Sequence, residues 1–454
     1  MVVIESTTHA DRPQYEAHHI VNELSPDLWQ SDYGVYDYDL QSRKLDELES
    51  VLSVKGIDPV ELDRAMAQTR EFIQYAFDLY EGRKSEPQDG SFAFVVPTRI
   101  ERENTDYAGE ATEHFPALRY VDAETRARML VGMCPFIIDR YGIDDDGKRG
   151  CMVFSPLFGD MMHDYGDDLE RLASVAKKVI NDTARFARDR LGASVVGLGA
   201  ILPRLTNHGR DIDVEGLHTT TGHGGTVHLI AETMRSAIDR GLVSNYAGRL
   251  GVLGAGNISS SVADVLLDRG IADMITLSDR PQQKDRLDAV VANLQSKYPN
   301  ARVLGSLSNA DVVRDNPACV SAVTTTFDLQ SPEWQGVDFE NMFMLDDSQP
   351  GCFNPQELEA RGAILAWVMG RDNTPGGLLT LENFEYGSTG PASKKDVWGC
   401  QGEAGAVYLT GELDASINQL VTPETAKRIG ELFVRAGVGA APLQRMGQYI
   451  KGVA

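Results

Sequence analysis

The stretch Arg249-Leu-Gly-Val-Leu-Gly-Ala-Gly-Asn-Ile-Ser-Ser-Ser-Val-Ala-Asp-Val-Leu-Leu-Asp268 passes from a short apolar segment through a glycine-rich turn into a segment with the apolar spacing of a helix. Gly254 suits a tight turn, Gly256 leaves room for a ligand at the backbone, and Ser259 stands where a third glycine often packs helix on strand. The start of such a helix offers N–H groups and the positive end of the helix dipole. The stretch therefore predicts a strand, turn and helix that bind the phosphates of a dinucleotide, the alternative being a purely structural unit.

A second apolar segment, residues 274–277, follows at the distance that the dinucleotide-binding motif requires. Asp279 at its end would bind a ribose 2′-hydroxyl and favour NADH, whereas Arg280 and Lys284 suit the 2′-phosphate of NADPH. We expect NADPH as the cofactor and keep NADH as the alternative. The remaining residues expected to contact the cofactor are Asn257, Ile258 and Ser259 at the start of the helix, and Thr324 after a later strand.

The chain is predicted to belong to the α/β class, with a doubly wound parallel-sheet Rossmann domain over residues 246–394. Short apolar segments spaced by polar or helical ones support this, at residues 302–304, 320–323, 342–345 and 364–368. A second α/β domain, expected to bind the substrate, covers residues 91–245. The closing residues 395–454, which include a predicted helix ended by Gly437, are expected to return to that second domain.

Residues 1–90 are predicted to form a helical extension. Asp58 and Pro59 are typical of the cap and first position of a helix, and apolar residues keep helical spacing from Leu62 to Phe77 before Gly82. The length of 454 residues agrees with two or three domains.

Composition excludes some functions. Lys and Arg total 43 against 67 Asp and Glu, a net charge of −24, which argues against a nucleic-acid-binding protein. No apolar stretch approaches the roughly 18 residues that span a bilayer, and the first residues lack the features of a signal peptide, so we expect a cytoplasmic protein. The cysteines form no C-x-x-C pair and suggest neither a zinc site nor a disulfide framework: Cys134, Cys151, Cys319, Cys352 and Cys400.

Residues 205–228 are rich in Gly and Thr and hold four of the nine histidines, His208, His218, His223 and His228. Just before the cofactor strand, such a segment would give a substrate carbonyl hydroxyl donors and a general acid. A metal site is not expected, because His218, His223 and His228 are spaced by five and turn away from one another on a helix. The alternative is a glycine-rich loop with ordinary surface histidines.

Cys400 follows a glycine and precedes a helical pattern. A thiol at the start of a helix has its thiolate favoured by the helix dipole, which makes Cys400 a candidate nucleophile. Glu403 lies one turn further on and would position the thiol, contact the substrate or cap the helix. The alternative is that Cys400 is a small buried apolar residue.

These features together resemble the long-chain acyl-[acyl carrier protein] reductases, which make fatty aldehydes from carrier-bound acyl thioesters. Three stretches within residues 92–454 carry the resemblance: Leu198-Gly-Ala-Ile-Leu-Pro-Arg-Leu-Thr-Asn207, Thr220-Thr-Gly-His-Gly-Gly-Thr226 and Cys400-Gln-Gly-Glu403. The chain departs from the family in having His223 for Asn, Gly225 for His, and Asp346-Asp-Ser348 where Asp-Gly-Gly is usual.

The resemblance implies that Cys400 forms an acyl-enzyme, that an arginine at the place of Arg280 goes with NADPH, and that the substrate arrives on acyl carrier protein or coenzyme A. Thr220, Thr221 or His223 would then hydrogen-bond the developing oxyanion. An acidic carrier would need a local basic surface. The candidate residues for such a basic surface are Arg43-Lys44, Arg83-Lys84, Lys177-Lys178, Arg204 and Arg210.

Two other hypotheses remain at this point. One is an NAD(P)-dependent alcohol or hydroxy-acid dehydrogenase of the shikimate-dehydrogenase type, which needs no cysteine. The other is a non-catalytic nucleotide-binding protein whose extension docks a partner. The oligomeric state does not follow from the sequence.

Overall fold

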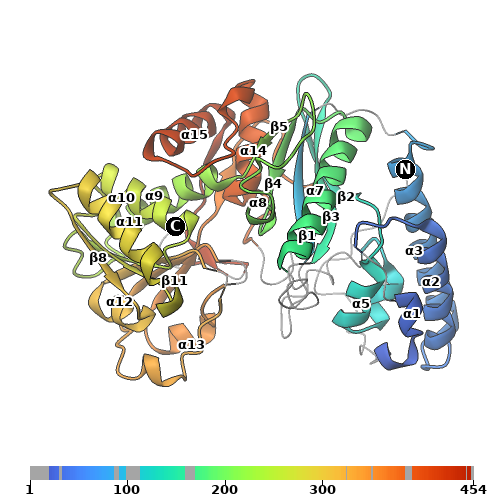
Figure 1. Cartoon of the computed structure of the whole chain (residues 1–454), viewed down its shortest axis with the longest axis horizontal. Coiled ribbons are helices and arrows are strands. Elements are labelled where there is room, and N and C mark those ends of the chain that lie inside the picture. Colours follow the sequence, from blue (N-terminus) through green and yellow to red (C-terminus); the bar gives the residue numbers. More distant parts are fainter. Residues whose placement is uncertain are drawn as a thin grey trace. The chain divides into compact units, whose positions relative to one another are not determined.

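The computed structural model describes residues 20–29, 33–85, 91–98, 113–158, 169–323, 325–348, 351–383, 391–445 and 447–450. It divides into two compact units (Figure 1). The first unit comprises residues 1–220 and 381–387, and the second comprises residues 221–380 and 388–454. Both units combine sheets with helices, so the predicted α/β class is confirmed.

The first unit is built on a five-stranded sheet in the order β2-β3-β1-β4-β5. Strands β3, β1, β4 and β5 run parallel, and β2 pairs antiparallel with β3. Their bounds are Phe92–Thr98 for β1, Phe136–Ile143 for β2, Arg149–Phe158 for β3, Val195–Leu198 for β4 and His218–Thr220 for β5. Helix α7 (Leu169–Leu191) packs against β1 and β3, and the short α8 is Leu202–Leu205.

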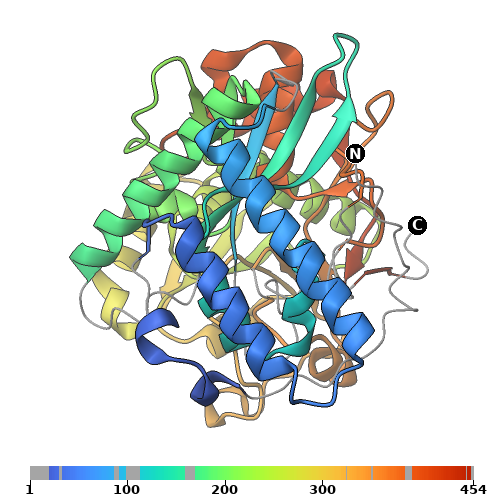
Figure 2. The ribbon, with the colours of Figure 1, turned by 90° about the vertical axis from the view of Figure 1, so that its right-hand side faces the viewer.

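The N-terminal helices belong to this same unit. They are η2 (Val21–Glu23), α1 (Pro26–Trp29), α2 (Tyr38–Leu52) and α3 (Pro59–Glu81), and Figure 2 shows α2 and α3 side by side. As predicted, the Asp58 carboxylate caps α3 by accepting the Glu61 N–H at 3.0 Å, and Gly82 ends the helix with a φ of +79°. Their apolar faces share one core with the sheet, so the helices do not form a separate extension domain.

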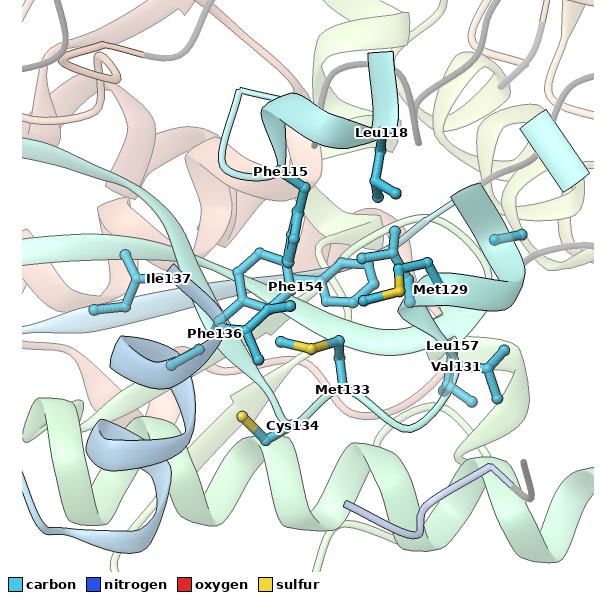
Figure 3. Packing of buried hydrophobic residues seen from close by; sticks show 14 of the residues in the cluster. Phe115, Leu118, Met129, Val131, Met133, Cys134, Phe136, Ile137, Phe154 and Leu157 are labelled. Carbon is cyan, nitrogen blue, oxygen red and sulfur yellow. The ribbon is translucent and has the colours of Figure 1, made fainter. Parts of the chain in front are cut away.

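Aromatic and sulfur-containing side chains fill the centre of this core (Figure 3). Phe136 of β2 and Phe154 of β3 lie 4.6 Å apart between ring centroids, and Phe115 approaches Phe136 edge-on at 5.5 Å. Met129 of α5 (Ala123–Leu130) and the fully buried Cys134 close the cluster, next to η3 (Pro116–Tyr120). Cys134 is thus a packing residue.

The second unit is built on an eight-stranded sheet in the order β16-β15-β11-β10-β9-β6-β7-β8. From β11 to β8 the strands are parallel, and β15 and β16 add an antiparallel edge. Numbered along the chain from β6, the parallel strands follow the 3-2-1-4-5-6 order of the Rossmann fold. The bounds are β6 Arg249–Leu253, β7 Met274–Ser278, β8 Arg302–Ser306, β9 Ala318–Ser321, β10 Phe343–Asp346, β11 Ile364–Trp367, β15 Gln444–Arg445 and β16 Gln448–Tyr449.

Helices and a small sheet surround these strands. α10 packs against β6 and β7, α11 against β7 and β8, and α12 across β6 to β9. The helices are α9 His223–Asp239, α10 Asn257–Asp268, η4 Pro281–Gln283, α11 Lys284–Lys297, α12 Asn309–Asp315, η5 Pro332–Trp334, α13 Pro355–Ala360, α14 Gly399–Thr410, η6 Leu413–Ala415 and α15 Pro423–Ala436. The small sheet has the order β13 (Asp396–Val397), β12 (Gly370–Asp372) and β14 (Val438–Ala440).

The division into units differs from the sequence-based one at two places. Residues 395–454 were expected to join the first unit, but α14 and α15 pack on α9, and β15 pairs with β11 through Gln444 and Trp367. Residues 221–245, which hold α9, also lie in the Rossmann unit, because α9 packs on α10. The helix predicted to end at Gly437 is confirmed as α15, with Thr422 as its cap. Among the described residues, no helix is long and apolar enough to cross a membrane.

Candidate functional site

The predicted dinucleotide turn connects β6 to α10. Gly254 has a φ of +84°, and a Cβ placed there would lie 3.0 Å from Val323 Cγ1, so both backbone conformation and space favour glycine. The Gly254 N–H donates to Ser278 Oγ at 3.2 Å, and Ser278 Oγ donates to Asn309 Oδ1 at 2.6 Å. This chain of hydrogen bonds ties the turn to the end of β7.

The start of α10 is open to an anion. The cap position is Gly256, which has no side chain to bond the first N–H groups, the first turn holds no acidic residue, and a Cβ built at Gly256 would meet nothing within 4 Å. Asn257 is exposed and Ile258 half-buried at the first two positions of α10. The residues present therefore fit a pyrophosphate group. Ser259 has a structural part in this turn, because its buried Oγ donates to the Leu253 carbonyl at 3.1 Å.

The residues expected at the ribose lie at the end of β7. The Asp279 carboxylate accepts the Arg280 N–H at 2.8 Å and pairs with Arg286 at 2.6 Å. Arg280 is exposed, and Lys284 pairs with Asp288 one turn further along α11. Arg286 was missed in the sequence analysis, because only folding brings its side chain back to Asp279. Thr324 lies outside the described residues.

Cys400, the second residue of α14, lies against the first turn of α9. Gly222, the cap of α9, has a φ of +71°, and a Cβ there would overlap Cys400 Cβ. A Cβ on Gly225 would likewise overlap the Gly399 carbonyl oxygen. The glycines of residues 220–226 therefore allow α9 and α14 to meet backbone to backbone.

Glu403 joins the two helices. Its side chain is fully buried, and its Oε2 accepts the Gly225 N–H at 2.6 Å. A carboxylate at this place satisfies an otherwise unbonded N–H group of the first turn and interacts favourably with the positive end of the α9 dipole. Glu403 was considered as a cap of its own helix, α14, but the observed hydrogen bond caps the neighbouring helix α9.

His223 and Thr221 lie with Cys400 in the second unit. The His223 N–H donates to Thr221 Oγ1 at 3.3 Å, and the Thr221 N–H donates to the Ile417 carbonyl at 2.8 Å. Thr220 is the last residue of β5 and belongs to the first unit. His208 and His218 also belong to that unit. All four clustered histidines are half-buried, and His223, the first residue of α9, is the one beside the α9–α14 junction.

His228 on α9 is a packing residue. Burial, and then the Arg269 guanidinium, lower the pKa of its imidazole to about 4. The His228 Nδ1 lies 3.2 Å from Arg269 Nη2, and the ring packs edge-on against Phe433 of α15. Among the described residues, no group of His, Cys, Asp or Glu is arranged to hold a metal ion.

The environment of Cys400 disfavours a thiolate. Burial, followed by the Asp347 and Glu403 carboxylates, raises the pKa of the thiol to about 12. The helix dipole was expected to lower this pKa, but desolvation of the thiolate is the larger effect. Burial, followed by the neighbouring Asp346, also raises the pKa of Asp347 well above its usual range.

Asp347, whose charge acts on the Cys400 thiol, lies at the end of a strand of the eight-stranded sheet. It directly follows β10, and its N–H donates to the Ser321 carbonyl at the end of β9 at 2.8 Å. Asp346 holds the next residues in place by accepting the Ser348 N–H at 2.9 Å and the Cys352 N–H at 2.8 Å. Asp347 therefore lies at the carboxyl edge of the parallel strands, the edge at which the β6–α10 turn also lies. Ligands of Rossmann folds bind at this edge, where the strand order reverses between β6 and β9.

Four of the cations proposed for a basic surface are buried or paired with acidic residues. Lys44 is buried, with its Nζ donating to the Arg128 and Val131 carbonyls at 3.0 and 2.9 Å. Burial lowers the pKa of Lys44 to about 7. The other paired cations are Arg83 with Asp78, Lys177 with Asp211, and Lys178 with Asp182.

No family model and no curated protein matches the chain. Similar solved structures include quinate dehydrogenase from Corynebacterium glutamicum in complex with NAD (14% identity, 76% of this chain and 99% of that chain, TM-score 0.31). Another is shikimate 5-dehydrogenase from Listeria monocytogenes in complex with shikimate and NAD (11% identity, covering 76% of this chain and 99% of that chain, TM-score 0.34). The minor L-lactate dehydrogenase from Enterococcus mundtii matches at 14% identity over 22% of this chain and only 38% of that chain, with a TM-score of 0.19. Because these identities and TM-scores are low, we assign the Rossmann fold from the strand order of the second unit.

Proposed function

We propose that the chain is an NADPH-dependent oxidoreductase that reduces a thioester-bound acyl group to an aldehyde, with Cys400 carrying the acyl group. The observation that carries this proposal is the position of Cys400, in the first turn of α14 and against Gly222 at the start of α9. The resemblance of residues 220–226 and 400–403 to acyl-[acyl carrier protein] reductases supports it. The acyl group arrives on acyl carrier protein or coenzyme A.

The cofactor would be held by the β6–α10 turn. Gly256 and the N–H groups in the first turn of α10 receive the pyrophosphate, and Arg280 receives the 2′-phosphate. A reduced nicotinamide bound there supplies the hydride, and thus the two electrons, that convert a thioester to an aldehyde.

Cys400 exchanges one thioester for another. Its sulfur bonds the acyl carbon, the bond from that carbon to the carrier sulfur breaks, and the carrier thiol leaves with the proton that Cys400 loses. On aldehyde release the bond to Cys400 breaks and its sulfur takes up a proton. Asp347 is the carboxyl group suited to move this proton, because burial and the neighbouring Asp346 raise its pKa and Glu403 is committed to the Gly225 N–H. Thr221 and His223, at the same junction, would hydrogen-bond the carbonyl oxygen.

A second candidate function is direct reduction or oxidation of a small carbonyl or hydroxy acid, without a covalent intermediate. The raised pKa of Cys400 favours it: with a pKa of about 12, roughly one thiol in 10⁵ is ionised at pH 7. In this function Asp347 or His223 is the proton donor, and Cys400 is a packing residue next to Gly222.

Intact-mass spectrometry distinguishes the two functions. The protein is mixed, without reduced cofactor, with acyl-carrier and acyl-coenzyme A thioesters of varied chain length. Variant Cys400→Ala is compared with Cys319→Ala, which removes a fully buried thiol of the same unit. Thioester reduction predicts an acyl adduct that Cys400→Ala lacks, that Cys319→Ala keeps, and that NADPH discharges as aldehyde.

The opposite result is equally informative. If no adduct forms while NADPH binds, and hydroxy acids are oxidised by both variants, direct dehydrogenation replaces the thioester proposal. Binding of NADPH without turnover of either substrate class would indicate a nucleotide-binding protein instead.

A further inference from the structure

We infer that Arg286 sets the preference between NADPH and NADH, by occupying the Asp279 carboxylate that would otherwise bind the ribose 2′-hydroxyl. This inference rests on the proposed cofactor site. Arg286 is not part of the glycine-rich turn, and it lies seven residues beyond the carboxylate that it contacts.

Both oxygens of Asp279 are engaged. The Oδ1 atom accepts the Arg280 N–H at 2.8 Å, and the Oδ2 atom accepts Arg286 Nη2 at 2.6 Å and Nε at 3.2 Å. The Asp279 side chain is only 6% exposed, whereas that of Arg286 is 47% exposed. Arg286 therefore covers the carboxylate from the solvent side, the side from which a ribose would approach.

The position of Asp279 makes this contact relevant to the cofactor. Asp279 directly follows β7, the neighbour of the strand that carries the phosphate turn, and its N–H donates to the Ser306 carbonyl at 3.1 Å. In Rossmann folds an acidic residue at this place binds the adenosine ribose of NAD. Here Arg286 of α11 already donates to the Asp279 carboxylate.

The charge that a 2′-phosphate would meet at Asp279 depends on the ion pair with Arg286. Asp279 and Arg286 neutralise each other and Lys284 is paired with Asp288, while the exposed Arg280 is balanced by Asp285 in the first turn of α11, so residues 279–288 carry no net charge. Without Arg286, the nearly buried carboxylate would face the 2′-phosphate of NADPH directly, and like charges at close range repel. With NADH the same carboxylate would accept a hydrogen bond from the 2′-hydroxyl.

The two candidate cations differ in what holds them. Lys284 and Asp288 are both exposed and form an ion pair one turn apart on α11. Arg286 instead presents two N–H groups to one carboxylate oxygen.

Equilibrium titration of NADPH and NADH tests the inference without measuring turnover. The variants are Arg286→Gln, Arg286→Lys, Asp279→Asn and the double variant Arg286→Gln with Asp279→Asn. The matched control is Arg249→Gln, which removes an exposed positive charge at the amino end of β6, the opposite edge of the sheet. Thermal unfolding confirms that each variant is folded.

We expect Arg286→Gln to shift the ratio of the NADPH and NADH dissociation constants at least about ten-fold toward NADH. Asp279→Asn should cancel that shift in the double variant, Arg286→Lys should shift the ratio less, and Arg249→Gln should leave it unchanged. An unchanged ratio in Arg286→Gln, or an equal loss for both dinucleotides, would overturn the inference and leave the proposed function standing. If the wild-type chain binds neither dinucleotide, the proposed function fails, and the inference fails with it.

Discussion

The Gly225 N–H donates a hydrogen bond of 2.6 Å to the carboxylate of Glu403, which lies 178 residues later in the chain. This bond joins the first turn of α9 to α14, next to the place where Gly222 meets Cys400. Its two partners come from segments that the sequence analysis assigned to different roles. The candidate site is therefore an assembly of two helix starts that glycine residues bring together.

Replacing Glu403 by alanine should lower the free energy of unfolding by about 2 to 4 kcal/mol, because a buried N–H group loses a charged acceptor. Glu403→Gln keeps an acceptor oxygen and should cost less. Urea unfolding followed by circular dichroism measures both variants. Equal stability of Glu403→Ala and the wild type would contradict the capping function of this carboxylate.

Gly222→Ala should be far more destabilising than Gly241→Ala. Both glycines have a left-handed φ, +71° and +72°, but a Cβ at Gly222 overlaps Cys400 whereas one at Gly241 meets nothing within 4 Å. We expect a loss of about 1 kcal/mol from the φ angle alone in Gly241→Ala, and about 3 kcal/mol or more in Gly222→Ala. Similar losses in the two variants would show that α9 and α14 are not in close contact in solution.

Alkylation of Cys400 by iodoacetamide should be slow at pH 7 and still rising at pH 10, because burial and the nearby carboxylates raise the pKa of the thiol to about 12. Asp347→Asn removes a negative charge that opposes the thiolate, so it should lower this pKa and speed alkylation. Mass spectrometry of the labelled peptide follows the rate, with Cys400→Ser as the blank. A rate that levels off below pH 9 in the wild type would refute a raised pKa.

Stability should fall in acid because of His228. The folded-state pKa of its imidazole is lowered to about 4, chiefly by burial, so the unfolded chain binds a proton more readily between about pH 6.5 and pH 4. The stabilising contribution is fully present above pH 6.5 and is lost as the pH falls through this range, up to about 3 kcal/mol. Unfolding free energies of the wild type and His228→Gln, measured from pH 4 to 8, give the comparison. A wild-type curve parallel to that of His228→Gln would count against this assignment.

Local sequence patterns were sufficient to predict several structural elements of this protein. The β6–α10 turn, the cap of α3 by Asp58 and the end of α15 at Gly437 are confirmed, because each depends on residues within a few positions of one another. The alternation of strands and helices likewise predicted the α/β class and the Rossmann sheet.

Other parts of the site depend on residues far apart in the chain. No local pattern pairs Arg286 with Asp279, since both lie among ordinary surface charges until α11 packs beside β7. Asp347 was noticed in the sequence only as a departure from a family pattern, and its electrostatic influence on Cys400 depends on the tertiary structure. The ionisation of Cys400 was predicted with the wrong sign, because burial depends on the whole fold and here exceeds the local effect of the helix start.

The sequence by itself thus determined many of the elements, their caps and the glycine-rich β6–α10 turn, since these follow from backbone geometry and short-range apolar spacing. Only the tertiary structure decided that residues 395–454 belong to the Rossmann unit, that Glu403 caps α9, and that Asp279 is taken by Arg286. The physical reason is that packing between distant segments sets which polar groups are buried and which charges are neighbours, and no short stretch of sequence specifies that.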